Sequence, residues 1–447
     1  MPIAPAPTSI PSGTAVDEQR LANQLLVLAG LGIVVRLLIA WMSYGTNDAV
    51  SFWEFAVQID QHGLLWMYRN VPLFNHPPLI GYWALAAMKL TAEAAPERFP
   101  FIFKLPVIAA DVLAAYLLWR IGKARSGPKL GATLAAVFCW SPVAILVSGY
   151  HCNTDNIYAA LCLLSVFLMG IDRPDSATSA RGRFLLAGLA LGAAINVKLI
   201  PVLLIPPLLL SCPDWRSASR FAAGLAIAAL PYLLPVLLAG EDFYRNVLAY
   251  RSQTNRWGLV FLLVEAQREQ ALRGWAEWVQ PLYLRYAPWV IILLVIALGA
   301  LNRRWPAWNR ATLCALCLAI FLILAPGFGA QYLVILLPLL FIADFRFAVG
   351  YSLLAGTFML LVYASFGATW ANSSILGYEL RQPMREPLNQ ALDMGLWYSH
   401  FAGMLPLAAS LVGLIAWVFL AQWTVRPIAS AATAAVRSYR HRAEKVG

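Results

Sequence analysis

The sequence predicts an all-α polytopic membrane protein with about 12 transmembrane helices and a large first outer loop that carries amphipathic, membrane-surface helices. Hydrophobic residues make up 60% of the 447 residues and charged residues only 12%. The apolar residues fall into many continuous runs, which is typical of helical membrane proteins. The net charge is +11, but most basic residues lie in short connections between apolar runs, as topology determinants do. This distribution indicates a lipid bilayer, and not nucleic acid, as the partner.

The chain begins with residues 1–20, which are rich in Pro, Ser, Thr and Ala and lack a basic region. The apolar run that follows is long and contains Arg36, so it predicts an uncleaved first helix rather than a signal peptide. We therefore expect a disordered cytoplasmic leader at 1–20, a single transmembrane domain at 21–426 and a basic cytoplasmic tail at 427–447.

Apolar segments long enough to be candidate spans recur along the whole domain. The short segments around 184–211, joined by "NVKLIP", leave the number of spans there open. Cys314 and Cys317 have a CxxC spacing but lie inside an apolar run, so we interpret them as core packing. The twelve segments lie near residues 25–44, 101–119, 130–149, 156–171, 184–197, 198–211, 221–239, 286–301, 311–325, 331–343, 347–366 and 401–423.

Charge assigns the connections to the two sides of the membrane. The short connections and the tail hold 18 basic and 5 acidic residues, which predicts that they are cytoplasmic. The loops 45–100, 240–283 and 367–400 hold 10 basic and 13 acidic residues and then fall outside. Both termini would be cytoplasmic, in a bacterial inner or plasma membrane, with the active site on the outer side.

Residues 79–91, "LIGYWALAAMKLT", are hydrophobic but would reverse every later assignment if they crossed the membrane. Thirteen helical residues reach only about 20 Å, short of the roughly 30 Å hydrocarbon core. We therefore interpret this segment as re-entrant or lying on the membrane, within one large outer loop.

The start of the first outer loop, "YGTNDAVSFWEFAVQIDQHG" (44–63), has polar and apolar residues at helical spacing. This pattern predicts an amphipathic helix on the outer surface, capped at Thr46 or Asn47. Asp48 would lie in the first turn, where the helix dipole favours a carboxylate. On this stretch alone, a cap that solvates the helix and a functional carboxylate explain Asp48 equally well.

Four of the five histidines map to the outer side. A single histidine there is more often an interfacial anchor than a catalyst. Together with Asp48 and Asp155, however, four of them indicate a polar, water-facing cavity. These histidines are His62, His76, His151 and His400.

Charged residues inside the predicted spans are costly, so each needs a partner or a wet cavity. For Asp111 and Lys104, two turns apart, a structural relay between helices is favoured slightly over a functional role. Lys198 is the stronger functional candidate, because it follows Asn196 and precedes Pro201, where a helix break would free backbone groups that a cavity satisfies. The complete set is Arg36, Lys104, Asp111, Asp155, Lys198 and Arg285.

Five ordered motifs between residues 44 and 340 together resemble the GT-C type integral-membrane glycosyltransferases, including mannosyl- and glucosyltransferases, which take sugar from a polyprenyl-phosphate carrier. The chain departs from that family in having neither a tandem Asp-x-Asp in the first loop nor a large C-terminal soluble domain, and the first departure weakens any metal site. The motifs are "NDAVSFWEFAVQIDQHGLLWMY…FNHPPLIGYW", "KLPVIAADVLAAYLLWRIGKARSG", "WSPVAILVSGYHCNTDNIYAALCLL", "AGLALGAAINVKLIPVLLIPPLLL" and "GAQYLVILLPLL".

The resemblance assigns roles to individual residues. Asp48, with Asn47 beside it, matches the acidic residue that is proposed as the base in the first loop. The Pro-Pro motif matches Pro77 and Pro78, preceded by His76. Two further motifs match at His151, Asn153, Asp155 and at Gln331, Tyr332.

Transfer of a hexose from a polyprenyl-phosphate sugar needs a base for the acceptor hydroxyl and cations for the departing phosphate. We predict Asp48, His76, His151 and Asp155 as catalytic residues. An interfacial aromatic belt with snorkelling arginines explains any one arginine of the second outer loop equally well. The predicted substrate-binding residues are Asn47, Glu54, Asn153, Lys198, Arg251, Arg256, Arg285, Gln331 and Tyr332.

No cofactor is firmly implied and no metal site is predicted. The expected partners are the polyprenyl-phosphate-linked sugar, the bilayer, and a glycan, lipid or protein acceptor. The alternative is a multi-pass transporter or lipid flippase, which would also need intramembrane charges and broken helices. Against it, the two halves show no internal repeat, and the polar residues gather at one face.

Overall fold

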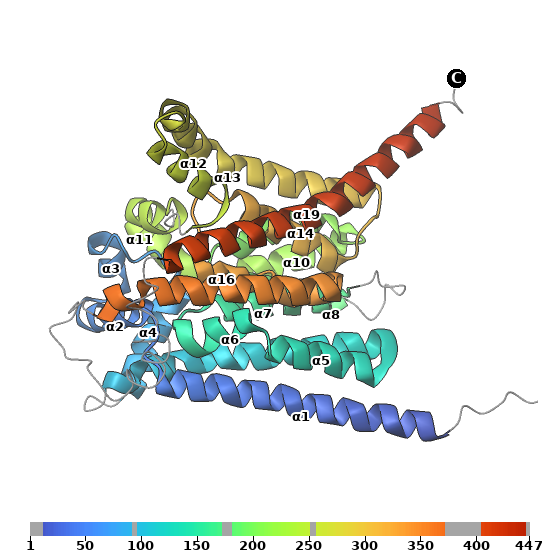
Figure 1. Cartoon of the computed structure of the whole chain (residues 1–447), viewed down its shortest axis with the longest axis horizontal. Helices are drawn as coiled ribbons and strands as arrows, with labels where there is room; N and C mark the ends of the chain where they lie inside the picture. Colours follow the sequence, from blue (N-terminus) through green and yellow to red (C-terminus); the bar gives the residue numbers. More distant parts are fainter. Residues whose placement is uncertain (1–11, 92–95, 172–180, 251–255, 372–403, 444–447) are drawn as a thin grey trace, which may run out of the picture.

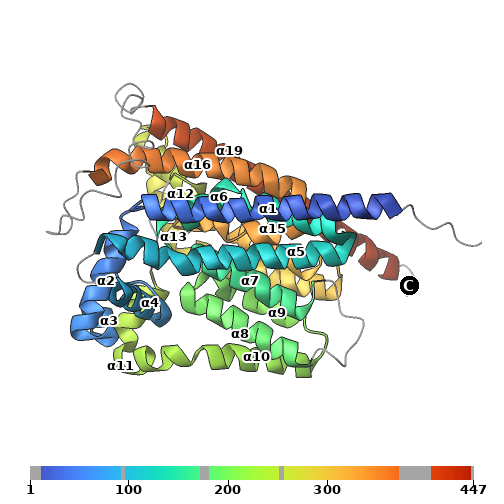
Figure 2. The ribbon, with the colours of Figure 1, turned by 90° about the horizontal axis from the view of Figure 1, so that it is seen from below.

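A computed structural model describes residues 12–91, 96–171, 181–250, 256–371 and 404–443. These residues form a bundle of long helices that run roughly parallel or antiparallel to one another (Figures 1 and 2). The part of the chain that is described contains no β-strand, which confirms the predicted all-α class.

Most helices run along the length of the bundle, and three short ones cluster at one end (Figures 1 and 2). The end cluster consists of α2 (Asp48–His62), α3 (Leu64–Asn70) and α4 (Pro78–Leu90). The remaining α-helices are α1 (Ser12–Met42), α5 (Phe99–Cys139), α6 (Pro142–Ile145), α7 (Asp155–Met169), α8 (Arg181–Val197), α9 (Ile205–Leu210), α10 (Trp215–Ala228), α11 (Leu233–Phe243), α12 (Gly258–Arg268), α13 (Arg273–Arg304), α14 (Arg310–Leu324), α15 (Leu337–Ala343), α16 (Phe345–Ala371) and α19 (Leu405–Ala443).

Shorter helical turns of other kinds connect several of these helices. Two of them, η2 (Leu146–His151) and η5 (Tyr244–Leu248), are π-helical. The 3₁₀ turns are η1 (Pro96–Arg98), η3 (Ile200–Leu204), η4 (Leu230–Tyr232) and η6 (Ala330–Val334).

All twelve predicted apolar segments overlap helices. Among the described residues, six helical segments are long and apolar enough to cross a membrane. Five shorter apolar helices accompany them, at Asp155–Met169, Gly182–Val197, Ile200–Leu210, Arg310–Leu324 and Ala330–Ala343. The exact number of crossings therefore stays a prediction. The six long segments are Asp17–Met42, Phe99–Cys139, Trp215–Leu248, Arg273–Arg304, Phe345–Ser365 and Leu405–Arg437.

α5 contains the predicted span 101–119 and the first half of the predicted span 130–149, because its backbone breaks between the two. Ser126 and Gly127 leave helical geometry, and Gly127 has φ +87°, a conformation that favours glycine. A Cβ on Gly122 would lie 2.7 Å from Cα of Gly131, so the two arms on either side of the break pack closely. The chain thus folds back and carries α6 and η2 toward the end of the bundle where α2 lies.

The α2–α4 cluster comes from the large first outer loop. α2 buries Ala49, Phe52, Phe55, Ala56 and Ile59, so one face is apolar, as the predicted amphipathic helix requires. α4 begins at the Pro-Pro motif, with Pro77 as its N-cap, and lies beside α2 and α3 rather than along the bundle (Figure 2). Whether residues 79–91 cross the membrane stays a prediction.

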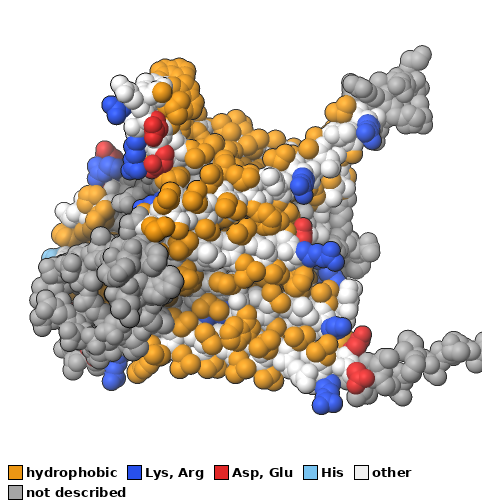
Figure 3. All heavy atoms as spheres, in the orientation of Figure 1, with side chains coloured by type: hydrophobic (Ala, Val, Ile, Leu, Met, Phe, Trp, Pro, Cys, Tyr) orange, Lys and Arg blue, Asp and Glu red, His pale blue; other side chains and the backbone are white. Residues whose placement is uncertain are grey.

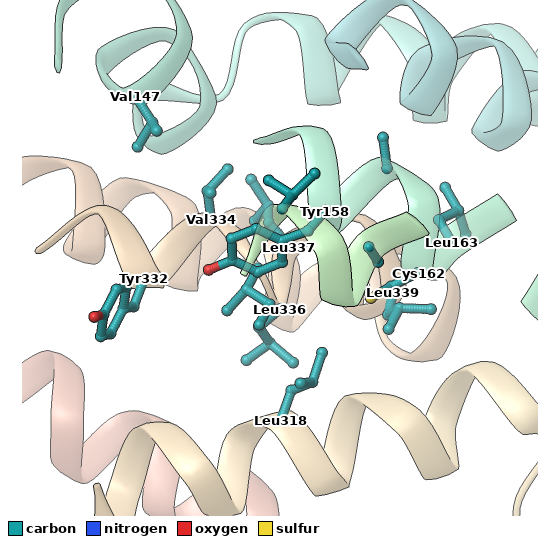
Figure 4. Packing of buried hydrophobic residues seen from close by; sticks show 14 of the residues in the cluster. Val147, Tyr158, Cys162, Leu163, Leu318, Tyr332, Val334, Leu336, Leu337 and Leu339 are labelled. Atoms are coloured by element: carbon teal, nitrogen blue, oxygen red, sulfur yellow. The ribbon is translucent and has the colours of Figure 1, made fainter. Parts of the chain in front are cut away.

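The surface matches a membrane protein. Figure 3 shows a mostly hydrophobic band over the helices, with Lys, Arg, Asp and Glu gathered toward the ends. Inside, α7, α14, η6 and α15 pack around Tyr158, beside Cys162, Leu318, Val334 and Leu337 (Figure 4). Cys314 and Cys317 are free and fully buried in α14, as core packing predicts.

Candidate active site

Asp48, the first residue of α2, meets two side chains that come from the far end of the α5 hairpin. Its Oδ2 accepts a 2.5 Å hydrogen bond from Nδ2 of Asn153 and lies 3.1 Å from Nε2 of His151. The Asp48 side chain is 30% exposed and that of His151 only 8%. Within the described chain every hydrogen bond to this carboxylate goes to Oδ2. The other oxygen, Oδ1, is available to a ligand.

Thr46 holds the start of α2 against His151. Its hydroxyl donates to the His151 carbonyl oxygen at 2.8 Å and accepts from the Asp48 N–H at 3.3 Å. Asn47 occupies the N-cap position, but its side chain makes no capping hydrogen bond. Of the two predicted cap residues, Thr46 is therefore the one whose side chain accepts a hydrogen bond from the start of α2. A Cβ on Gly45 would lie 2.5 Å from the Tyr150 carbonyl oxygen, so the close approach needs glycine.

The backbone around His151 is irregular. η2 is a π-helical turn that ends at His151, and the next residue, Cys152, has φ +64°. π-Helical turns and left-handed non-glycine residues recur at functional sites, where surrounding structure holds them in place. The irregular turn directs the His151 side chain toward Asp48, with Asn153 two residues further on.

Asp155 and Lys198 form a second pair in the same region. Lys198 Nζ lies 3.1 Å from both carboxylate oxygens of Asp155, and the Tyr158 hydroxyl donates to Oδ1 at 2.6 Å. Lys198 Nζ also lies 4.5 Å from the centre of the Tyr332 ring. The Asp155 side chain is fully buried, whereas that of Lys198 is 16% exposed. The ammonium group is therefore held by Asp155 and the Tyr332 ring, in a side chain that is not fully buried.

Chain topology explains why this pair forms. α7 begins at Asp155, and α8, which packs against it, ends at Val197, one residue before Lys198. Two antiparallel helices joined at one end place the start of the first beside the end of the second. Asp155 also lies in the first turn of α7, where the helix dipole favours a carboxylate.

Electrostatics connect the two pairs. Burial raises the pKa of the Asp48 carboxyl. The hydrogen bonds from His151 and the Asn153 amide, together with the charge of Lys198, outweigh burial, so the pKa of Asp48 lies below its usual value. Asp48 is therefore ionised at neutral pH, and Nε2 of His151 donates to it.

His76 lies near this group without a hydrogen bond to Asp48. Its ring packs against Phe52 at 4.9 Å and near Phe55 and Phe74, while its carbonyl oxygen accepts from the Tyr68 hydroxyl at 2.9 Å. Burial, with a smaller contribution from Lys198, lowers the pKa of His76 to about 3 although Asp48 opposes the shift. The imidazole is neutral at physiological pH, and its catalytic role stays a prediction.

The remaining predicted substrate-binding residues are spread more widely. Arg256 donates to the Pro406 carbonyl oxygen and the Ser410 hydroxyl, so it ties its loop to α19. Arg285 is exposed on α13 beside Tyr286. Gln331 folds its side chain back over Gly329.

Asn47 is exposed, and Glu54 is half-buried on α2 without a described bond to Asp48. Burial raises the pKa of Glu54. Arg251 and His400 lie outside the described residues, and so does most of loop 367–400. His62 is exposed and stacks on Trp66.

The prediction that Asp111 and Lys104 act together is wrong, because each bonds other residues. Asp111 accepts from Arg36 Nε at 2.7 Å and from Asn156 at 2.7 Å, whereas Lys104 donates to the carbonyl oxygen and hydroxyl of Ser43. Asp111 therefore ties α5 to α1, whereas Lys104 ties α5 to Ser43, the residue that follows α1. Asp111 does not join Asp155 and Lys198 in one central charge cluster, which a transporter would favour.

Two tyrosines at the site are not predicted by the sequence. Tyr158 bonds Asp155, and the ring of Tyr363 on α16 lies 5.3 Å from that of His151. Aromatic residues inside apolar runs look like core packing until their neighbours are known. Among the described residues, no group of three or more His, Cys, Asp or Glu is placed to hold a metal ion.

The helical membrane fold carries its polar cluster at one end, and two comparisons with known proteins place it among the GT-C type membrane glycosyltransferases. The fold is similar to the crystal structure of ArnT from Cupriavidus metallidurans in the apo state, with a TM-score of 0.50 and 16% identity over 92% of this chain and 75% of that one. The model of glycosyltransferase family 87 matches residues 94–327, more than half of the chain, and the chain belongs to that family. No curated protein matches the sequence.

The matched region contains His151, Asn153, Asp155 and Lys198 but begins after Asp48. Because the chain belongs to a glycosyltransferase family, the alternative of a transporter or flippase is discarded. The family match does not identify the base, the donor or the acceptor.

Proposed function

We propose that the protein transfers a hexose from a polyprenyl-phosphate sugar to an acceptor hydroxyl on the outer face of the membrane, with Asp48 as the general base. The observation that carries the proposal is the geometry at Asp48. Oδ2 is fixed by His151 and Asn153, and Oδ1 is left to accept a proton. A base held in one orientation takes the acceptor proton without reorganising.

The lowered pKa of Asp48 suits this role in one respect and limits it in another. It keeps the carboxylate ionised and ready. It also makes the carboxylate a weaker base, so proton transfer is favourable only once the acceptor oxygen has begun to bond to the anomeric carbon. Both effects fit a reaction in which departure of the phosphate runs ahead of proton transfer from the acceptor.

Lys198 supplies the positive charge for that departure. Its ammonium is anchored by Asp155 and the Tyr332 ring, and the side chain as a whole is 16% exposed. A pre-positioned cation stabilises charge on a leaving phosphate at no cost of reorganisation. Because Asp155 is bound to both Lys198 and Tyr158, it is not free to attack the sugar. We therefore propose a single displacement, which inverts the anomeric centre.

Replacement of the base tests the proposal. Purified full-length protein is assayed for transfer of labelled hexose from polyprenyl-phosphate mannose or glucose to glycolipids of the membrane. We expect Asp48→Asn to lower kcat by about a hundredfold or more, the usual contribution of general-base catalysis.

Asp60→Asn is the matched control. Asp60 lies on the same helix, but it is an exposed residue that pairs with Lys89 on the surface, so transfer should be unchanged. Undiminished transfer by Asp48→Asn would remove Asp48 as the base.

A further inference from the structure

Two buried polar atoms beside Asp48 have no hydrogen-bond partner among the described residues. One is Nδ1 of His151, on the side of the ring that faces away from Asp48. The other is the hydroxyl of Tyr363. The two residues are only 7% and 3% exposed, respectively, so bulk water does not satisfy either atom freely.

The two atoms lie on neighbouring side chains. The rings of His151 and Tyr363 lie 5.3 Å apart at 38°. Tyr363 also interacts electrostatically with both carboxylates of the site, those of Asp48 and Asp155. Tyr363 comes from α16, more than 200 residues after His151. The fold therefore brings a third polar group from a distant helix to the catalytic pair.

A buried polar group without a partner destabilises a protein, so such groups are usually paired or functional. Because Nε2 of His151 donates to the Asp48 carboxylate, Nδ1 of the neutral ring is an acceptor. The tyrosine hydroxyl both donates and accepts. The group that complements this pair is another hydroxyl, which donates to Nδ1 and accepts from Tyr363.

We infer that Nδ1 of His151 and the Tyr363 hydroxyl together bind one hydroxyl group of a sugar substrate. The inference rests on the proposed function and makes Tyr363 a substrate-binding residue. The sugar is either the transferred hexose or a sugar of the acceptor, because both present hydroxyls. Binding there also fixes the proton of His151 on Nε2, so the occupied site holds Asp48 through a neutral donor.

Tyr351 provides a matched control on the same helix. It is fully buried, as Tyr363 nearly is, but its hydroxyl donates to the Leu333 carbonyl oxygen at 3.1 Å. Tyr351→Phe removes a bond that the fold uses, whereas Tyr363→Phe removes a hydroxyl for which the described chain has no partner. The two variants lose the same atom from different surroundings.

The first experiment measures thermal unfolding of the substrate-free full-length protein in detergent. We expect Tyr351→Phe to lower Tm and Tyr363→Phe to leave it unchanged or raise it. A fall in Tm with Tyr363→Phe as large as with Tyr351→Phe would mean that the hydroxyl is a structural group, and it would overturn the inference.

The second experiment measures transfer kinetics with polyprenyl-phosphate mannose or glucose and the glycolipid acceptor. Tyr363→Phe should raise one KM by about threefold to tenfold, the effect of losing one neutral hydrogen bond. A raised KM for the donor assigns the hydroxyl to the transferred sugar, and a raised KM for the acceptor assigns it to the acceptor. Tyr351→Phe should change neither KM.

Failure of the inference and failure of the proposed function give different results. If both KM values are unchanged in Tyr363→Phe while Asp48→Asn abolishes transfer, only the inference fails. If the wild-type protein transfers no hexose from either donor, the proposed function fails and the inference fails with it.

Discussion

The protonation state of Asp48 depends on a few neighbouring side chains. Burial favours the neutral acid, and the groups around Oδ2 favour the carboxylate more strongly. The sequence located Asp48, His151 and Asn153, because polar residues at the ends of apolar runs stand out from their surroundings. It did not predict that the Thr46 hydroxyl bonds both His151 and Asp48, because Thr46 looks like an ordinary helix cap. It did not predict Tyr363 at the site either, because Tyr363 looks like an ordinary core residue.

Removal of His151 should shift the pH dependence of transfer. Asp48 acts as the carboxylate, so its lowered pKa places the acid limb of kcat/KM below the usual carboxyl range near pH 4. In His151→Phe the effect of burial is opposed less, and the pKa of Asp48 rises. We expect the midpoint of the acid limb to move to higher pH, measured from profiles of kcat/KM.

His62→Phe is the control for this profile, because His62 is exposed and stacks on Trp66 without touching Asp48. Its acid limb should coincide with that of the wild type. An unchanged midpoint in His151→Phe would show that His151 does not set the ionisation of Asp48.

Between helices, polar contacts inside the bundle hold α1 and α5 in register. Arg36 and Asp111 are fully or almost fully buried, and Arg36 also bonds the carbonyl oxygens of Gly32, Phe138 and Cys139. Cys139 lies at the end of α5, so this one side chain joins α1 to both arms of the α5 hairpin. The contact therefore helps to set the position of η2, and so of His151, relative to α2.

Loss of one partner of this pair should destabilise the protein strongly. Asp111→Ala leaves the Arg36 guanidinium buried without its counter-charge, and we expect a loss of about 3–5 kcal/mol in unfolding free energy. Replacement of both residues, Arg36→Met with Asp111→Leu, should recover most of it. Unfolding in detergent, followed by heat or denaturant, measures both variants.

The surface pair Lys89–Asp60 serves as the comparison, since its side chains are 59% and 40% exposed, respectively. Lys89→Met should cost less than about 1 kcal/mol. A similar small loss in Asp111→Ala would mean that the buried pair contributes no more than an exposed one.

Across the whole molecule, the path of the chain gathers the site at one end. α1 begins and α19 finishes at the end of the bundle opposite to α2, α3 and α4 (Figure 1). α5 folds back on itself at that same opposite end (Figure 1), and Lys and Arg are among the charged side chains there (Figure 3). This agrees with the charge-based assignment, although which side faces the cytoplasm stays a prediction.

Labelling of single cysteines tests that assignment. The six native cysteines are all free and buried, so they should react slowly. We expect Asn70→Cys, exposed on α3, to react with a membrane-impermeant maleimide from the outer side. Ser126→Cys, exposed at the α5 break, should react only after the membrane is opened.

The unmodified protein gives the background of this assay, and labelling in inverted vesicles should reverse the pattern. Reaction of both cysteines from the same side would contradict the predicted topology. Reaction of Ser126→Cys alone from outside would invert it.

The sequence by itself determined the class of fold, the amphipathic first-loop helix and the polar residues that flank the spans. These properties depend on composition and on periodicity within one segment, which no distant contact alters. Only the tertiary structure decided which of these residues meet: Asp48 with His151 and Asn153, Asp155 with Lys198, Asp111 with Arg36 instead of Lys104. Such pairings depend on where the backbone reverses, at Ser126–Gly127 and between antiparallel helices, and on an irregular turn at His151. A linear pattern carries no measure of those distances.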